Sequence, residues 1–487
     1  MNQNNLEKAK KYFNNGLQYF NAKDYIKAET EFLESLKFYP NRISVIINIL
    51  QIYLLTENLI KIEIFLNRFQ DNNIISLIKS YQYYLLKKYD KSIAECKDLL
   101  KSELENIKAQ IYDLLAKNFF KKENFLKTIF YYKKIKSINK NDYLNYYNIG
   151  CLFLLLGRKK QAYYYFKKSN RINPVDNLVT WNLAWCSLAL GHLDVGFKLF
   201  EKRWDIVEGH KKRFVNIHEI NNLEHIINKK VLVWDEFGLG DVIQFSRFVI
   251  DLLKYTKKIT LVVNKSLVQL LNFLDKDIKV TTYEDLNVED IDYQISICSL
   301  PRILRLKNFQ DITFKKIILP NTYPQEFQKY NIKDDTFNVG VAWSGNPKNS
   351  NDIYRSIPFK NFDSIFRIPK TKFFRLHQNL EEKAFNNNNI TDLGDKNFFE
   401  LSYFLKKLDL IISVDTSIIH LCGILGIKSI LLLNLNSDWR WFLDDEKTIW
   451  YPSIQIFKQR CYGNWNNVFE KLNSEILLLS KKKFNKL

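Results

Sequence analysis

Hydrophobic and polar positions follow two different periods along the chain, and the change comes near residue 210. Before it, small and bulky side chains recur with a step of about 34 residues. Three registers keep this step together, with a double step first: Gly16, Ser80, Ala116, Gly150 and Ala184; Ala28, Ser92, Thr128, Ala162 and Gly196; and Phe32, Cys96, Tyr132, Phe166 and Phe200. Small residues let the two helices of a hairpin approach, and bulky residues fill the seam to the next hairpin. The pattern therefore predicts about six helical hairpins, the second of them degenerate.

Beyond residue 210, short apolar runs alternate with helical stretches, which is typical of parallel α/β structure. The runs predict strands at 231–233, 258–263, 277–281 and 293–297, and then at 339–343, 372–376, 410–414 and 428–433. Helices are expected at 266–274, 359–366, 397–407, 418–425 and after Val468. We predict an α-solenoid over residues 1–210, a linker over 211–229, a Rossmann-like lobe over 230–330 and a second over 335–487. Two such lobes in tandem imply a cleft between them.

Charge and cysteine usage narrow the class of protein. The formal net charge is +20, but the lysines are spread along the chain without an arginine-rich stripe, so we expect a basic solvated surface and no nucleic-acid partner. Phosphate-bearing substrates and acidic partners stay compatible. The six cysteines form no CxxC or Cys/His cluster, which predicts buried thiols in a reducing compartment and no metal site. The start, MNQNNLEKAK, lacks the apolar core of a signal peptide, and no run of about 18 apolar residues predicts a transmembrane helix. The expected location is the cytoplasm, with peripheral association with the inner membrane left open.

The stretch VLVWDEFGLGDVIQFSRF, residues 231–248, holds the first candidate site residues. A predicted strand passes through Gly238 and Gly240 into a predicted helix, whose N-terminal backbone amides favour anions. Asp241 then lies at the carboxyl end of a strand, the edge where open α/β sheets bind ligands. Two roles stay open for it: a cap for the helix, or a general base that takes a proton from an acceptor hydroxyl. The glycine pair lacks the full GxGxxG of dinucleotide binders.

Arg355 lies in a loop rich in Gly, Asn and Pro that follows a predicted buried strand. Its guanidinium has the bidentate donors that suit a pyrophosphate. A surface salt bridge with Asp352 is the alternative.

The stretch LDLIISVDTSIIHLCGILG, residues 408–426, runs from an apolar strand into a helix. Thr416 and Ser417 at the helix start supply hydroxyls and amides for a diphosphate cradle. His420 lies about one turn further along, so it and Thr416 face the same side, although packing is the other explanation for a single histidine. Asp415 either accepts hydrogen bonds from sugar hydroxyls or caps the helix.

The fourth stretch is SDWRWFL, residues 437–443, with WYP at 450–452. Its two tryptophans flank Arg440, and they either stack on a base or sugar or anchor the loop to the core. Asp438 and Arg440 are candidate substrate-binding residues.

Taken together and in order, these stretches resemble tetratricopeptide-repeat (TPR) glycosyltransferases related to the heptosyltransferase family, glycosyltransferase family nine. The repeats up to about residue 210 follow the TPR period and its small, aromatic and proline pattern. The other matching motifs are WDEFGLGDVIQFSRF, VAWSGNPKNSNDIYRSIP, LDLIISVDTSIIHLCGILG, DWRW and WYPS. More distantly, the chain resembles the protein O-linked N-acetylglucosamine transferases, which also join such repeats to a catalytic half.

This resemblance implies a GT-B fold with two Rossmann-like lobes and an inverting, metal-independent transfer from a nucleotide-diphosphate sugar, with no cofactor. It makes Asp241 the base and Arg355 a contact to the diphosphate. It matches the family's Asp-Thr-x-x-x-His signature to Asp415, Thr416, Ser417 and His420.

Two positions depart from the family pattern. Phe237 stands where a glutamine is expected, and Ser417 stands where heptosyltransferases have glycine. These departures leave open whether the site makes a polar contact to the acceptor and whether it is specific for heptose.

The acceptor is expected to be a protein, a glycan or a lipid, and the repeat surface is expected to bind a protein partner. Two other functions stay open: a non-catalytic TPR scaffold with a relic transferase domain, and a nucleotide-sugar epimerase of similar fold.

Overall fold

The computed structural model describes residues 3–67, 69, 72–101, 107–206, 210–320, 332, 334–347, 352–376, 390–393, 396–442 and 446–485. The chain divides into two compact units, Met1–Leu152 and Phe153–Leu487, hereafter unit 1 and unit 2. The division falls inside the repeats and not at their predicted end near residue 210, so the last helical hairpins belong to the same unit as the α/β structure. The predicted domain boundaries themselves stay predictions.

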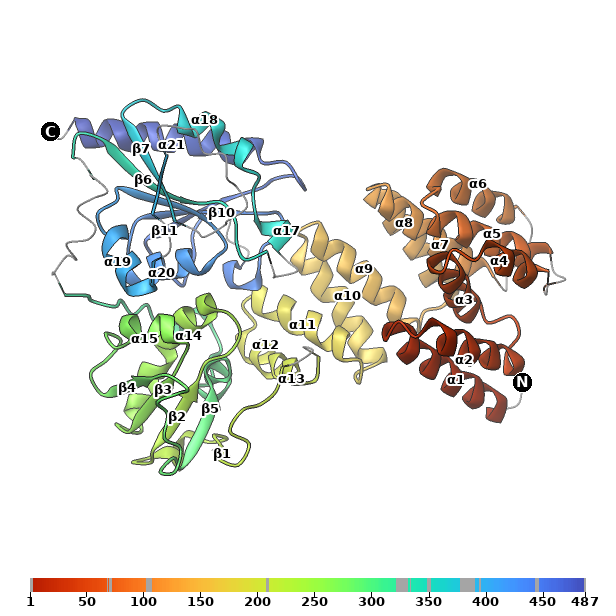
Figure 1. Ribbon diagram of the computed structural model, residues 1–487, viewed down its shortest axis with the longest axis horizontal. Coiled ribbons are helices and arrows are strands. Elements are labelled where there is room, and N and C mark those ends of the chain that lie inside the picture. The colour runs from red at the N-terminus through yellow and green to blue at the C-terminus, as the bar shows by residue number, and fades with distance from the viewer. Residues whose placement is uncertain are drawn as a thin grey trace. The chain divides into compact units, whose positions relative to one another are not determined.

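Unit 1 is helical (Figure 1). Its helices are α1 (Gln3–Asn21), α2 (Tyr25–Phe38), α3 (Ile43–Leu55), α4 (Leu59–Leu66), α5 (Asn72–Leu85), α6 (Tyr89–Leu99), α7 (Lys108–Lys121), α8 (Phe125–Ile138) and most of α9 (Tyr143–Leu155). Unit 2 continues the series with α10 (Lys159–Ile172), α11 (Asn177–Ala189) and α12 (Leu193–Phe200). These twelve helices of the described residues match the six predicted hairpins. In the second hairpin, which was predicted to be degenerate, α4 has only 8 residues, and α12 of the last hairpin is equally short.

Three of the hairpin turns share one local design. In each of these turns, a residue with positive φ directly precedes the N-cap residue of the second helix; these residues are Lys23, Glu57 and Glu123. The caps are Asp24, Asn58 and Asn124, and each side-chain oxygen accepts a hydrogen bond from the backbone N–H three residues further on. Each cap therefore satisfies a donor that the first helical turn leaves unpaired.

Gly16 explains why the repeat needs small residues. A Cβ built on Gly16 would lie 2.5 Å from the ring of Phe32, so only a glycine lets α1 and α2 approach this closely. Phe32 shares a buried core with Val45 and Ile46 of the next hairpin. It therefore packs within its own hairpin as well as against the next one, whereas the sequence predicted only the second contact.

The rest of unit 2 contains two parallel sheets. The first sheet has the order β1-β5-β2-β3-β4 and consists of β1 (His218–Glu219), β2 (Val231–Trp234), β3 (Ile259–Val262), β4 (Ile278–Thr281) and β5 (Tyr293–Ser296). The second has the order β11-β10-β9-β6-β7-β8 and consists of β6 (Phe337–Ala342), β7 (Thr371–Arg375), β8 (Ile390–Asp392), β9 (Leu410–Val414), β10 (Ser429–Leu433) and β11 (Ile454–Lys458). All eight predicted strands are present, each within two residues of its predicted bounds.

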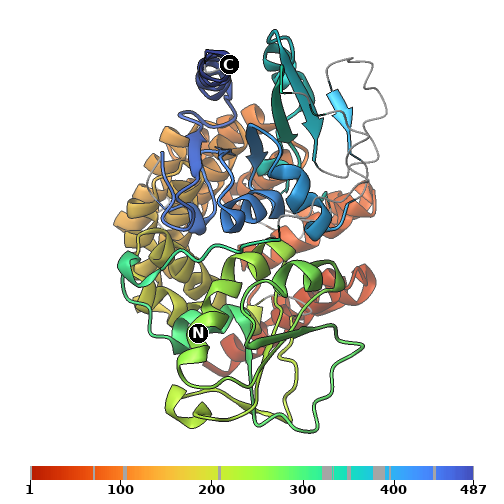
Figure 2. The same cartoon turned by 90° about the vertical axis from the view of Figure 1, so that its left-hand side faces the viewer.

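Helices lie against both sheets (Figures 1 and 2). They are α14 (Leu239–Asp251), α15 (Lys265–Leu271), α16 (Leu300–Ile303), α17 (Asp352–Arg355), α18 (Asp363–Phe366), α19 (Phe398–Leu405), α20 (Ser417–Leu425) and α21 (Asn466–Phe484), and α13 (Arg203–Ile206) follows the last hairpin. The helix predicted at 359–366 is a 3₁₀ turn, Phe359–Phe362, followed by α18.

Three strands escaped the sequence analysis. The edge strands β8 and β11 are short or moderately polar, so their pattern is weak. The third, β1, lies in the segment predicted as a linker and pairs in parallel with β5, where His218 is opposite Tyr293. A two-residue strand has no period to detect.

One hydrophobic core runs through much of unit 2. It joins residues of the last hairpin, the first sheet, α14, α20 and the loop after β10, for example Phe197, Val233, Phe245, Leu421 and Trp439. The space between α14 and α20 is therefore partly filled by packed side chains. A separate core with Trp343, Phe362 and Leu472 lies where α18 and α21 cover the second sheet.

The structure tests the prediction that the six cysteines are buried thiols. Cys96, Cys186, Cys298 and Cys422 are buried and Cys151 is partly buried, but Cys461 is exposed, so the prediction of buried thiols is wrong for that residue. Cys461 sits in an irregular loop next to β11, where no apolar period indicates burial.

None of the helices among the described residues is both long and apolar enough to cross a bilayer.

Candidate functional site

Asp241 lies in the first turn of α14, directly after the glycine turn that follows β2. Its Oδ2 accepts a hydrogen bond from the backbone N–H of Gly238 at 3.0 Å, so Asp241 helps to cap the helix, but the N-cap residue itself is Gly238, three residues before the position predicted for it. Its Oδ1 forms an ion pair with Arg440, from the loop after β10. The side chain of Asp241 is 22% exposed. One oxygen thus caps the helix start, while the other faces the loop after β10 in the second sheet.

Arg440 lies between two carboxylates. One terminal nitrogen contacts Asp241 and the other donates to Asp438 Oδ1 at 2.9 Å. Its guanidinium lies over the ring of Trp439, 4.6 Å from the centroid. Its Nε is buried and has no hydrogen-bond partner among the described residues. The Nε–H group is therefore one of the donors that a further acceptor could satisfy.

Gly240 is the point where the tips of α14 and α20 meet. A Cβ on Gly240 would lie 2.9 Å from Cδ2 of His420 and 3.3 Å from Cα of Ser417. The absence of a side chain at Gly240 lets the two helix N-termini approach. Gly238, by contrast, has only the Asp241 carboxylate within that range, at 3.3 Å.

His420 is held from two sides. Its Nδ1 lies 2.9 Å from the hydroxyl of Tyr451, and its ring stacks on Trp441 with the centroids 5.3 Å apart. Its Nε2 lies 4.0 Å from Asp415 Oδ1. Burial lowers the pKa of His420 well below its usual value, and the positive charges of Arg440 and Arg247 lower it further. The imidazole is therefore neutral at pH 7.

Asp415 and Asp241 share an acidic environment. Burial and the negative charge of Asp438 raise the pKa of Asp415 to about 6. Burial also raises the pKa of Asp241, against the opposing effect of Arg440. Carboxyl groups with a raised pKa are better proton acceptors than ordinary ones, and they mark candidate functional sites.

The hydroxyls of the α20 tip lie at the same edge. Thr416 is the cap residue of α20, and its Oγ1 lies 3.2 Å from Ser413 Oγ. Thr416, Ser417 and Asp415 are all partly exposed. The structure thus brings Asp415, Thr416, Ser417 and His420 to the tip of α20, next to Gly240.

Arg355 forms the ion pair that the sequence left as its alternative role. Its Nε donates to Asp352 Oδ1 at 2.9 Å, and its side chain is 25% exposed. Its positive charge opposes, but does not outweigh, the burial that raises the pKa of Asp415. Residues 348–351 of the predicted loop lie outside the described residues.

The tryptophans of the fourth stretch anchor the loop to the core. Trp439 and Trp441 are each 1% exposed, and Trp450 is fully buried. The core interpretation is therefore confirmed, because a ring that takes a base or sugar needs an open face. The loop as a whole presents Asp438 and Arg440 to the site.

Sequence reasoning missed the polar residues that support the site. Lys159 of α10 and Arg203 of α13 are buried and contact the Arg440 loop and Glu236, respectively. Arg247 of α14 is buried with its guanidinium over Tyr451, 4.9 Å from the ring centroid. Both positions in the repeats were interpreted only as parts of helices. Both residues have charged neighbours in the sequence, so nothing local marks them as buried, and their partners are too distant in sequence for a pattern to reveal.

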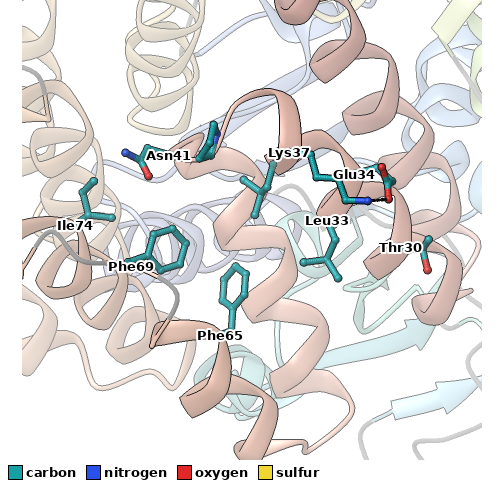
Figure 3. Close-up of a pocket in the computed structure, with 10 residues that line it drawn as sticks. Thr30, Leu33, Glu34, Lys37, Asn41, Phe65, Phe69 and Ile74 are labelled. Atoms are coloured by element: carbon teal, nitrogen blue, oxygen red, sulfur yellow. Dashed lines mark hydrogen bonds and ion pairs between the residues drawn. The ribbon is translucent and has the colours of Figure 1, made fainter.

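A hollow separate from the residues around Asp241 lies in unit 1, among α2, α4 and α5 (Figure 3). Its volume is about 750 Å³. Apolar side chains including Leu33, Phe65 and Phe69 line it, and the Glu34–Lys37 ion pair lies at its side. This hollow is a concave surface that the described repeats offer to a partner.

Clusters of metal-binding side chains were the remaining kind of site to look for in the described residues. The described residues include no group of three or more His, Cys, Asp or Glu side chains arranged to hold a metal ion.

Comparisons with known proteins give likenesses to two kinds of structure. No family model matches the chain, and no curated protein matches it. The type IV pilus biogenesis factor PilW is 16% identical, with 42% of this chain and 94% of that chain covered and a TM-score of 0.30. YrrB, a TPR protein with an unusual peptide-binding site, is 14% identical, with 41% and 86% covered and a TM-score of 0.23. A glycosyltransferase family 9 protein from Veillonella parvula DSM 2008 is 12% identical, with 54% and 100% covered and a TM-score of 0.38.

The structural neighbours thus include TPR proteins and a family 9 glycosyltransferase. The described chain has helical repeats followed by two parallel α/β sheets. At such low TM-scores, these likenesses carry no argument about activity.

Proposed function

We propose that unit 2 is a glycosyltransferase of the GT-B kind, which moves a sugar from a nucleotide-diphosphate sugar to an acceptor hydroxyl with inversion and without a metal. The observation that carries this proposal is the Asp241 carboxylate. It has a raised pKa, it is partly exposed, and it faces Arg440 next to the tips of two helices. A proton acceptor beside anion-binding groups is what such a transfer requires.

The donor would bind at the tip of α20. Its diphosphate would take hydrogen bonds from the Thr416–Ser417 helix start, from Arg440 Nε and from Arg355. In the structure Arg440 is engaged by Asp241, so the diphosphate competes with that carboxylate for the guanidinium. Binding of the donor would then free Asp241 at the moment when it is needed as a base.

Transfer would follow in one step. Asp241 takes the proton of the acceptor hydroxyl, and the acceptor oxygen forms a bond to the anomeric carbon. The bond from that carbon to the diphosphate oxygen breaks, and its electron pair leaves with the diphosphate. The growing charge on the leaving group is stabilised by Arg440, Arg355 and the helix-tip amides. Asp415 and Asp438 would accept hydrogen bonds from sugar hydroxyls.

The test is a comparison of Asp241→Asn with the unchanged protein. A thermal-shift panel of nucleotide sugars first identifies the donor, because a ligand that binds the folded state raises the melting temperature. Release of nucleoside diphosphate then measures transfer. We expect Asp241→Asn to lower the rate by about 10²- to 10⁴-fold while donor binding is kept or tightened, because the neutral amide competes less for Arg440. Asp251→Asn, at the other end of α14, is the matched control, and an unchanged rate in Asp241→Asn would overturn the assignment.

A non-catalytic scaffold is the second candidate, because the packed core between α14 and α20 fills part of the space that a substrate cleft needs. In that case unit 1 would carry the function by binding a protein partner on its repeat surface. Nucleotide-sugar binding with no transfer to any acceptor, in a protein that still melts cooperatively, would support the scaffold.

A further inference from the structure

Lys159 links the repeats to the loop that carries Arg440. This lysine begins α10 and is 1% exposed. Its ammonium group donates to Ser437 Oγ at 3.3 Å, to the carbonyl of Asp438 at 3.4 Å and to the carbonyl of Phe442 at 3.2 Å. These three acceptors come from both ends of one short loop. Lys159 therefore holds the loop closed around Arg440.

Arg203 makes the corresponding link to the turn that carries Asp241. Its side chain has no exposed area, and its Nε and NH2 donate to the two oxygens of Glu236 at 2.5 and 2.9 Å. Glu236 is 4% exposed and also accepts a hydrogen bond from Ser296 Oγ. One of its oxygens lies 2.7 Å from His210 Nε2. A buried two-point contact fixes direction as well as distance.

Phe237 shows why the turn needs such support. Its φ is 61°, in the left-handed region that a bulky residue rarely adopts. Its ring stacks on His210 with centroids 4.6 Å apart, and His210 stacks on Trp204 at 5.0 Å. The unusual backbone conformation therefore sits directly between Glu236 and the glycine turn, and contacts from the end of the repeats surround it.

Trp439 joins the two links. It is buried, and its ring lies 5.8 Å from Phe197 and 6.3 Å from Phe200 of α12, measured between centroids. It also lies 6.5 Å from Phe245 of α14. The last hairpin thus packs between the loop after β10 and the helix after β2.

We propose that helices α10 to α13 act as a positioning element, in which Lys159 sets the position of Arg440 and the Arg203–Glu236 pair sets that of Asp241. This inference rests on the proposed function for its kinetic consequences. The end of the repeats is then part of the transfer site and not a detachable handle. Lys159 and Arg203 contact no substrate, so they are positioning residues that act through the two loops.

The two links predict two different kinetic effects, because the proposed roles of their targets differ. Arg203→Lys keeps the charge but loses the two-point contact, so the base is misplaced. We expect kcat to fall about tenfold or more with the donor KM changed less than about threefold. Lys159→Met keeps the volume but releases the Arg440 loop, so the donor KM rises about tenfold or more, and kcat also falls because Arg440 stabilises the leaving diphosphate. Glu236→Gln is the second variant for the first link, should Arg203→Lys fold poorly.

Hydrogen exchange of the full-length protein tests the links without any activity. We expect Arg203→Lys to speed exchange at residues 238–242 and Lys159→Met to speed it at 437–442, each about tenfold or more, with α20 protected in both. Arg213→Lys is the matched control, because Arg213 pairs with Asp235 at 3.1 Å one residue before Glu236, from a half-exposed position. It should leave both segments unchanged.

Unchanged exchange at 238–242 in folded Arg203→Lys and Glu236→Gln, or equal acceleration over all of unit 2, would overturn the proposal. The exchange pattern also separates this inference from the proposed function. If exchange behaves as expected but no donor is turned over, the positioning element stands and the transferase assignment fails.

Discussion

Replacing Gly240 by alanine tests whether the two helix tips really meet at this residue. The added Cβ would lie 2.9 Å from His420 Cδ2 and 3.3 Å from Ser417 Cα. Carbon atoms in favourable contact are about 3.5–4.0 Å apart, so a movement of roughly 0.6 Å or more is needed. The His420 ring cannot easily move, because Tyr451 and Trp441 hold it. The α14 and α20 tips must therefore separate.

We expect Gly240→Ala to destabilise the protein by about 1–3 kcal/mol, the usual cost of overpacking a close contact. For a cooperative unit of several hundred residues this lowers the melting temperature by only about 2–6 °C, so urea unfolding is the better assay. Gly238→Ala is the matched control, because its nearest neighbour is the Asp241 carboxylate at 3.3 Å. It should cost less than about 1 kcal/mol.

A double-mutant cycle decides whether His420 is the cause. In a His420→Ala background the imidazole is gone, so most of the Gly240→Ala penalty should disappear. The reasoning is refuted if the penalty is the same in both backgrounds, or if Gly240→Ala is no less stable than Gly238→Ala.

Two further predictions follow from burial and charge. Burial raises the pKa of Asp415 in the folded protein to about 6, from an ordinary aspartate value of about 4, so the folded protein holds this proton more tightly and loses stability as the pH rises from about 4 to 6. Asp415→Asn should therefore be more stable than the unchanged protein by up to about 3 kcal/mol above pH 6, with no gain below pH 4, in urea unfolding across that range; a pH-independent difference would contradict it. For the thiols, burial raises the pKa of Cys96 and Cys422 to about 12, whereas Cys461 is exposed. Labelling of the native protein followed by mass spectrometry should modify Cys461 well before those two, and equal rates would show that the burial is wrong.

The sequence predicted the fold well where its pattern was long and periodic. The 34-residue register located the hairpins, because each repeat must bury the same face against its neighbour. The largely apolar runs of β2, β6, β9 and β10 revealed central strands, since both faces of a parallel sheet are covered. The edge strands β1 and β8 were missed, because two or three residues with one covered face leave no such signature.

The candidate site was predicted in part. Strand ends and glycines located Asp241, Asp415 and the α20 tip, because parallel strands bring their carboxyl ends to one edge. The choice of partners was beyond the sequence. Asp241 and Arg440 are 199 positions apart, and nothing local distinguishes Arg440 from Arg355 as the arginine that faces Asp241. The contacts of Lys159 and Arg203 depend on how the last hairpin packs within unit 2, which no period encodes.

The closed Asp241–Arg440 pair has different costs under the two proposed functions. In a scaffold, the two carboxylates paired with Arg440 and the neighbouring Asp415 raise one another's energy, and the buried Arg440 Nε, which has no partner among the described residues, forfeits a hydrogen bond for no structural gain. Asp415 loses further, because its charged form is disfavoured by burial. In a transferase, the same features are the resting state of a site that awaits a diphosphate and sugar hydroxyls. A donor supplies the acceptor that Nε lacks, and its hydroxyls satisfy the carboxylates. The charge arrangement therefore supports the enzyme over the scaffold, although the packed core next to it is compatible with both.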